Sequence, residues 1–123
     1  MCIFCDIIKE KRHHIHENRL ACSFFDSYPV NPGHVLIVPK RHVKDYFELT
    51  KEEKNEIDNE IIFLKSKLDD EFHPDGYNIG INNGEAAGQT VFHLHVHLIP
   101  RYKHDVENPK GGVRGVIPDK QRY

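Results

Sequence analysis

The chain has 123 residues, a length that fits one domain with a hydrophobic core of its own. Its 17 basic and 19 acidic residues leave a formal charge of -2, so we expect no nucleic-acid partner and no membrane partner. No apolar run approaches the roughly 18 residues of a membrane helix. The absence of a signal-peptide pattern and an odd number of cysteines (3) then favour a cytoplasmic protein without a disulfide framework.

The first part of the chain predicts one short helix and two strands. The helix covers residues 1–10, and the polar segment 11–18, which holds three histidines, is expected to be a solvated loop. A buried strand is predicted over residues 19–26 and a β-branched apolar strand over residues 34–39. The segment between these two strands is dense in turn-forming residues.

A long helix is predicted from Thr50, which can act as the N-cap, with Glu53 placed to complete a capping box. Apolar residues then recur at helical spacing, at Ile57, Ile61, Leu64, Leu68 and Phe72. Ile62 and Phe63 widen this stripe, which suits a sheet on one side and a partner subunit on the other. The turn formers at residues 73–76 end the helix.

Two more strands are predicted near the end of the chain, over residues 77–82 and 91–99. The order of the elements predicts an α+β domain, an antiparallel β-sheet of about five strands with one long helix on one face. We expect a single domain over residues 1–123, with its core in residues 1–101 and a polar C-terminal tail in residues 102–123.

The strongest functional signal is the run from His93 to His97, in which histidine alternates with apolar residues. In a strand, His93, His95 and His97 share one face, with neighbours roughly 6.6 Å and the outer pair roughly 13 Å apart. A single metal ion, which holds imidazole nitrogen at about 2.1 Å, would be strained by all three. A neutral middle histidine can instead attack phosphorus, while its neighbours hold the phosphate oxygens.

Two other interpretations of this run stay open. Alternating histidine and apolar residues also occur on a strand that is merely half exposed, and two of the histidines can share one metal ion. Three histidines in strict alternation between apolar residues favour the catalytic interpretation over both.

The run also resembles a known signature. The segment His93–Ile99 matches the His-φ-His-φ-His-φ-φ motif of the histidine triad (HIT) hydrolases, where φ is an apolar residue. Further segments fall in the order typical of the Hint-like bacterial branch of that family, and the resemblance covers residues 2–101. These segments are Phe24-Phe25-Asp26, Pro32-Gly33-His34, Val38-Pro39-Lys40-Arg41-His42, Asn83-Gly84 and Gly88-Gln89-Thr90.

The resemblance implies the roles of individual residues. His95 corresponds to the nucleophile that attacks the α-phosphorus of a nucleotide, and His97 and His34 correspond to its phosphate-binding and orienting partners. The implied nucleotide-binding residues are Asp26 for the ribose hydroxyls, Phe24 for the base, and Asn83, Gln89 and Thr90 for the phosphate or leaving group. Phe24 has an equally good interpretation as an ordinary core residue.

The implied activity is hydrolysis of small conjugates of a purine nucleotide, either nucleoside phosphoramidates or dinucleoside polyphosphates, through a covalent nucleotidyl-histidine. A nucleotidyl transferase is the alternative, but His97 stands where the galactose-1-phosphate uridylyltransferase branch has glutamine, which favours hydrolysis. A nucleotide-sensing module with little turnover and a metal carrier also stay open. Members of the family form homodimers, and we expect a homodimer here.

A second candidate site lies at the N-terminus, where Cys2 and Cys5 have the spacing of metal ligands. They can also be small apolar residues or a redox pair. The resemblance implies a structural Zn²⁺ held by Cys2, Cys5, His42 and His93, a closed set of four ligands, and no organic cofactor. His93 then serves the metal rather than the phosphate. Cys22, which alternates with apolar neighbours, is expected in the core.

Overall fold

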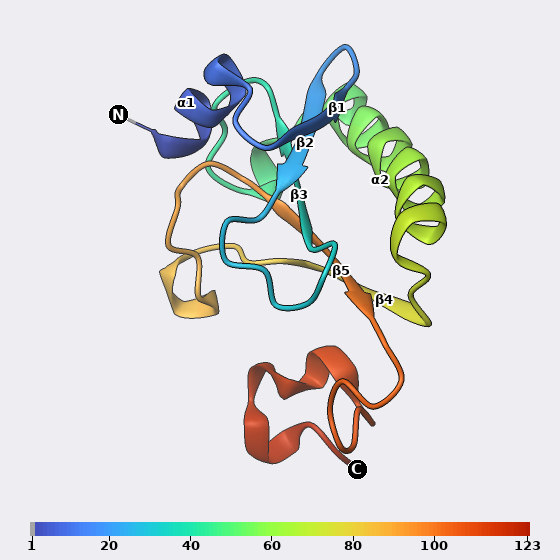
Figure 1. Cartoon of the computed structure of the whole chain (residues 1–123). Coiled ribbons are helices and arrows are strands. Elements are labelled where there is room, and N and C mark those ends of the chain that lie inside the picture. Colours follow the sequence, from blue (N-terminus) through green and yellow to red (C-terminus); the bar gives the residue numbers. More distant parts are fainter. Residues whose placement is uncertain (1) are drawn as a thin grey trace.

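The computed structural model describes residues 2–123, which form a five-stranded antiparallel sheet flanked by two helices (Figure 1). The strand order across the sheet is β1-β2-β3-β5-β4. The predicted α+β architecture is therefore confirmed. The strands are β1 (His14–Glu17), β2 (Ala21–Phe25), β3 (Val35–Pro39), β4 (Gly76–Ile81) and β5 (Val96–Arg101), and the helices are α1 (Ile3–Glu10) and α2 (Lys51–Phe72).

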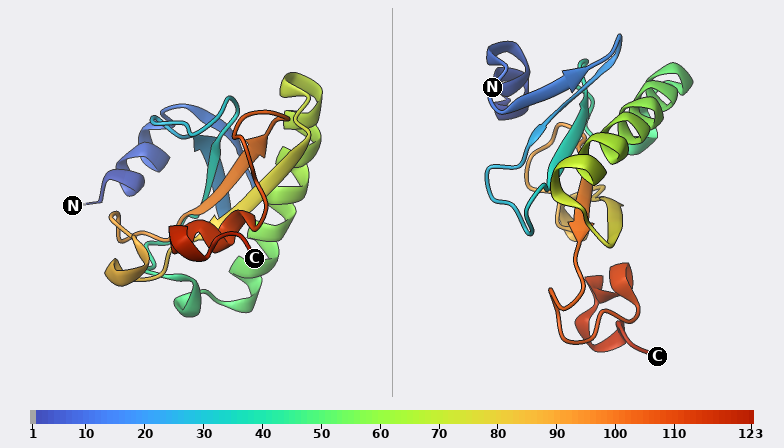
Figure 2. Two further views of the ribbon diagram at one scale, coloured as in Figure 1. Left: turned by 90° about the horizontal axis from the view of Figure 1, so that it is seen from below. Right: turned by 45° about the vertical axis from the view of Figure 1, so that its right-hand side comes forward.

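The two helices lie on opposite faces of the sheet (Figures 1 and 2). Alternating residues of β3 show why: Val35 and Ile37 pack into the core beneath α2, whereas Leu36 and Val38 pack with Phe4 of α1. Helix α1 covers only the part of its face formed by β2 and β3. The same face of β5 and β4 is left without a helix, and the catalytic candidates lie there.

Helix α2 begins with the predicted capping box: Thr50 accepts from the Glu53 backbone N–H, and the Glu53 carboxylate accepts from Thr50 N–H. The helix ends at His73, which adopts a left-handed conformation (φ 52°). The predicted stripe is buried at its centre, where Leu64 is fully buried. Ile62 (69% exposed) lies on the outer side of the helix, away from the sheet.

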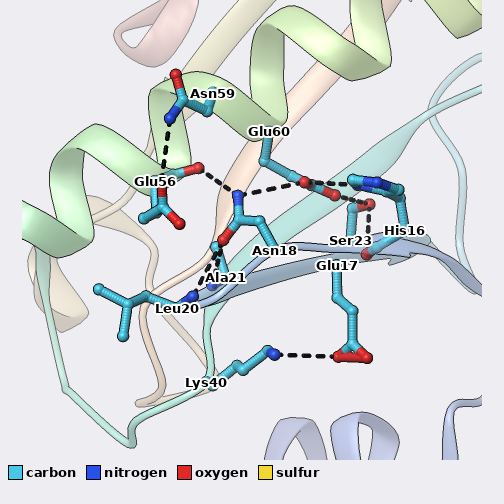
Figure 3. Close-up of polar contacts among 10 residues, drawn as sticks. All are labelled: His16, Glu17, Asn18, Leu20, Ala21, Ser23, Lys40, Glu56, Asn59 and Glu60. Carbon is cyan, nitrogen blue, oxygen red and sulfur yellow. Dashed lines mark hydrogen bonds and ion pairs between the residues drawn. The ribbon is translucent and has the colours of Figure 1, made fainter.

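The expectation of a solvated loop over residues 11–18 is wrong, because this segment contains β1. Two of its polar residues, His16 and Asn18, bind α2, whereas residues 11–13 are exposed. Buried Glu60 of α2 accepts hydrogen bonds from His16 Nδ1 (2.8 Å) and Ser23 Oγ (2.7 Å), as Figure 3 shows. The strand was not predicted because the residue that binds His16 and Asn18, Glu60, lies about 40 positions away on a helix.

The strand predicted over residues 91–99 is displaced toward the C-terminus. Strand β5 begins only at Val96 and runs through Pro100 to Arg101. Its pairing with β3 stops at Ile37, opposite Val96, and its pairing with β4 also stops at Val96. Residues 91–95 therefore precede the sheet, and of the three alternating histidines only His97 lies in a strand.

Beyond β5, residues 102–123 form short turns of 3-10 helix, Gly112–Val116 and Pro118–Lys120, at one end of the sheet (Figure 2). The Arg101 guanidinium fixes the start of this tail by two hydrogen bonds to Asp105 (2.7 and 2.8 Å). Within the described residues, neither helix has both the length and the apolar character needed to cross a membrane.

Candidate active site and metal-binding cluster

Three of the predicted catalytic residues meet on the face of the sheet that α1 leaves open. His97 lies in β5, His95 directly precedes β5, and His34 directly precedes β3. The ring centroid of His97 is 5.1 Å from that of His95 and 5.2 Å from that of His34. Gly33 allows the approach to β3, because its φ of +87° favours glycine and a side chain there would press on Phe72.

Hydrogen bonds assign the position of the proton on His34 and His97. Val30 N–H donates to His34 Nδ1 (3.0 Å), so the proton of neutral His34 is on Nε2. That N–H donates to His97 Nδ1 (3.0 Å), with the Asp26 carboxylate also near it (3.4 Å). His97 therefore accepts on Nδ1 and carries its own proton on Nε2.

His95 has the opposite arrangement. Its Nδ1 lies 3.0 Å from the backbone oxygen of His93, which can only accept, so Nδ1–H donates. The lone pair of Nε2 is then available for a bond to phosphorus. The ring is 8% exposed, and Phe4 of α1 packs edge-on against it with centroids 4.9 Å apart.

The electrostatic environment keeps the two partner histidines neutral. Burial, and after it the nearby His95 and His34, lower the pKa of His97 to about 4 against the opposing effect of Asp26. Burial also lowers the pKa of His34, again against the pull of Asp26. Near pH 7 both rings are therefore uncharged, as the hydrogen-bond pattern requires.

A cavity of about 270 Å³ opens beside these histidines. His34 and His97 form one wall, Asn78 and Gly80 of β4 form another, and Val113 of the tail closes one end. The cavity therefore depends on residues separated by most of the chain.

The predicted nucleotide ligands fall into three groups. Asp26 lies in the catalytic group, where one carboxylate oxygen accepts from Tyr28 N–H (2.8 Å) and the other faces His34. Phe24 is 3% exposed and packs against Phe4, with ring centroids 5.6 Å apart. It is a core residue in this arrangement, in keeping with its second interpretation.

Asn83, Gln89 and Thr90 lie in the loop between β4 and β5. Gln89 is 2% exposed and fully engaged: its oxygen accepts from Gly84 N–H, and its amide donates to the carbonyls of Lys44 and Val91. Asn83 accepts from Tyr46 N–H (2.9 Å). Thr90 is exposed. In this arrangement Asn83 and Gln89 shape the loop, and a direct contact with a nucleotide requires Gln89 to exchange one of its bonds.

The four predicted metal ligands converge as the resemblance implies. The ligand atoms of Cys2, Cys5, His42 and His93 all lie within 4.8 Å of one another. His93 Nε2 donates to the Pro39 carbonyl (2.8 Å), so the lone pair is on Nδ1, 3.5 Å from the sulfur atoms of both cysteines. The cluster can hold a metal ion. Cys22, which is 2% exposed, lies in the core as expected.

Asp26, His34 and His97 also bring three potential ligand atoms within 4.8 Å of one another. This group does not fit a metal ion. The Val30 N–H occupies His34 Nδ1 and leaves the proton on Nε2, the atom that faces the other two residues. A metal ligand needs a lone pair there.

Three contributors to the site lie outside the residues predicted from the sequence. Phe4 contacts the His95 ring, Val30 fixes the His34 proton through its backbone, and Asn78 lines the cavity. Only Phe4 carried a signal, as an apolar residue on the inner face of the first helix. Val30 acts through its main-chain N–H, and Asn78 reaches the cavity through the register of β4. Neither property can be read from a pattern of residues.

Comparisons with known proteins identify the family of the chain. The model of the HIT domain family matches residues 9–104. The protein named "Protein hit" of Bacillus subtilis is 40% identical over 103 residues, which cover 82% of this chain and 71% of that protein. A crystal structure of a HIT family protein from Bacillus anthracis has a TM-score of 0.78 and 44% identity, and covers 82% of this chain and 73% of that chain.

Two further relatives carry more specific names. A Zn-bound histidine triad family protein from Mycobacterium smegmatis has a TM-score of 0.77 and 34% identity, over 85% of this chain and 77% of that chain. A bis(5'-adenosyl)-triphosphatase of Dictyostelium discoideum is 46% identical over 89 residues, 72% of this chain and 60% of that protein. The fold, the histidine arrangement and these matches together show that the chain belongs to the HIT family.

Proposed function

We propose that this protein is a nucleotide hydrolase that cleaves small nucleotide conjugates at the α-phosphate, with His95 as the nucleophile. The observation that carries the proposal is the hydrogen bond from His95 Nδ1–H to the His93 carbonyl (3.0 Å). It holds the neutral tautomer whose Nε2 lone pair is ready to attack. The bis(5'-adenosyl)-triphosphatase named among its relatives supports a nucleotide as the substrate.

The reaction proceeds in two displacements. His95 Nε2 forms a bond to the α-phosphorus, and the bond from phosphorus to the leaving group breaks. Water then attacks the same phosphorus, the bond to His95 breaks, and a nucleoside monophosphate is released. One water molecule is consumed, and the enzyme returns to its starting state.

The neighbouring residues stabilise the phosphate during both steps. His97 Nε2–H is the donor for a phosphate oxygen, because its Nδ1 is engaged with His34. His34 orients His97 and does not itself need to touch the substrate. We assign Asp26 to the ribose hydroxyls, since a carboxylate accepts two hydrogen bonds. Thr90 is exposed and is proposed to contact the phosphate or leaving group, as is Gln89 once it exchanges one of its bonds. Phe24 and Asn83 complete the proposed site for a purine nucleotide by supporting it from the core and the loop.

We also propose that the cluster of Cys2, Cys5, His42 and His93 holds a structural Zn²⁺. Bond lengths of about 2.3 Å to sulfur and 2.1 Å to nitrogen give a tetrahedron with sulfur–nitrogen edges of about 3.6 Å. The recorded sulfur–nitrogen distances are 3.4 to 3.5 Å. We expect one zinc per chain by elemental analysis, and protein never exposed to chelator that contains none contradicts this assignment.

We further propose that two chains associate through α2 and the edge strand β4. Ile62 and Phe63 expose apolar surface on α2 (69% and 43%), and Ile79 does so on β4 (51%). Strand β4 is the last strand of the sheet order, so its outer edge is available for pairing within the described structure. Sedimentation at micromolar concentration should give twice the chain mass, and a monomer contradicts the proposal.

The His95→Ala variant tests the activity. We expect turnover to fall at least about 10³-fold while nucleoside monophosphate still binds, because the nucleophile is lost and the phosphate donors remain. The assay compares a nucleoside phosphoramidate with a dinucleoside polyphosphate and thereby also identifies the leaving group. A wild-type protein that binds nucleotide but turns over neither substrate is a sensing module instead.

A further inference from the structure

The proposed nucleophile lies in a segment that the sheet does not hold. Residues 91–95 precede β5, whose pairing with both neighbours stops at Val96. Among the described residues 2–123, the segment makes one backbone hydrogen bond outside the strands, from Leu94 N–H to Val43 O (2.7 Å). The sheet therefore does not determine the orientation of the His95 ring.

Besides the neighbouring ring of His97, with centroids 5.1 Å apart, two contacts hold the His95 ring, and both lead to the metal-binding cluster. His95 Nδ1–H donates to the backbone oxygen of His93, whose ring is one of the four ligands. The His95 ring also packs against Phe4, which lies between Cys2 and Cys5 in the chain. His93 is thus shared: its side chain belongs to the cluster, and its carbonyl holds the nucleophile.

We propose that the cluster of Cys2, Cys5, His42 and His93 acts as a positioning unit for His95, beyond holding the fold together. The inference rests on the proposed role of His95. The His93 ring is held between the two sulfur atoms and the Pro39 carbonyl. Because the ring is held, the backbone carbonyl of His93 also keeps its position as the acceptor for His95 Nδ1–H. When the cluster opens, His93 is released and His95 can move its proton to Nε2, the tautomer that cannot attack.

This coupling predicts a loss of chemistry without an equal loss of binding. Asp26, His34 and His97 lie in or directly beside strands that pair across the sheet, and their mutual hydrogen bonds do not pass through the cluster. Opening the cluster should therefore lower kcat and leave KM for the nucleotide nearly unchanged.

His42 is the ligand that tests the proposal with least disturbance, because its residue is exposed, whereas His93 is fully buried. We expect His42→Ala to lose the metal and to lower kcat by about 10- to 100-fold, the range of such supporting changes. His42→Cys keeps four ligands and should restore both. Lys51→Ala, an exposed position at the start of α2 and away from both sites, is the control and should behave as wild type.

The decisive readout is the His95 tautomer, measured by ¹⁵N NMR of labelled imidazole rings. Wild type and His42→Cys should show the proton on Nδ1, and His42→Ala should show a large share on Nε2. Chelator treatment of the wild type, reversed by added zinc, gives the same comparison if His42→Ala does not fold. Metal loss with kcat and tautomer unchanged overturns the proposal. A wild type that holds the metal and keeps His95 in the Nδ1–H tautomer but shows no turnover is a different outcome. That result contradicts the proposed function and not the positioning of His95 by the cluster.

Discussion

At the scale of single residues, the chemistry depends on where three imidazole protons lie. A main-chain donor, Val30 N–H, places the His34 proton, and His34 then sets the tautomer of His97. A main-chain acceptor, the His93 carbonyl, sets that of His95. The result is a ring N–H donor beside the proposed nucleophile, an arrangement that suits attack on a phosphate.

The His34→Gln variant tests whether His34 orients His97. In the His34→Gln variant a flexible amide replaces the oriented N–H, so His97 loses its fixed tautomer and donates less reliably to the phosphate. We expect kcat to fall about 10²-fold, a typical cost of a misplaced acid–base group, with a smaller change in KM. Steady-state kinetics on a phosphoramidate measures both. An unchanged kcat contradicts the orienting role.

The sequence indicated which histidines to expect in the candidate site, but it did not indicate which nitrogen of each ring carries the proton. The alternation of histidines and the family resemblance led to His95, His97 and His34, which the fold brings together. Tautomers depend on which backbone atom lies opposite each ring nitrogen. That information exists only once Val30 and His93 have their folded conformations.

At the scale of elements, the differences between expectation and structure occur where a segment depends on distant partners. The helix with its own capping box and periodic stripe was predictable, because those signals are local. Strand β1 was not, since its polar residues are stabilised by α2. The start of β5 was not, since it is set by where the pairing of β5 with β3 ends, at Ile37 opposite Val96.

Glu60 tests the docking of α2 on β1 and β2. Glu60→Ala removes the acceptor of the His16 ring and one of the two acceptors of the buried Ser23 hydroxyl, which keeps only the His16 carbonyl (Figure 3). We expect a loss of about 2–3 kcal/mol in the free energy of unfolding. Urea denaturation measures it, with Asn59→Ala on the exposed side of α2 as the control. A loss equal to that of the control would show that the buried carboxylate does not stabilise the interface.

At the scale of the whole molecule, the site joins parts of the chain that are distant in sequence. The N-terminal cysteines meet His93, and Val113 of the tail meets His34 and His97 at the cavity. Burying histidines in this way makes stability depend on pH. His34 and His97 have folded pKa values below the ordinary 6.5, because burial disfavours their charged forms.

The sign of that dependence follows from linkage. Between pH 6.5 and about 4 the unfolded chain binds protons that His97 in the folded chain does not, so stability is complete above pH 6.5 and falls as the pH decreases through this window. We expect metal-free protein to be less stable to urea at pH 5 than at pH 7, and His97→Gln to reduce that difference. Equal stability at the two pH values contradicts the assignment.

The central claim is a covalent bond between His95 and a nucleotide, and intact-mass spectrometry of the reacting enzyme tests it most directly. Enzyme is mixed with a nucleoside phosphoramidate and quenched during the first turnover in denaturant above neutral pH, which preserves phosphorus–nitrogen bonds. The account predicts a mass increase of one nucleoside monophosphoryl group per chain, located on His95 by fragmentation and absent from His95→Ala. Turnover without that adduct, or an adduct on another residue, contradicts it.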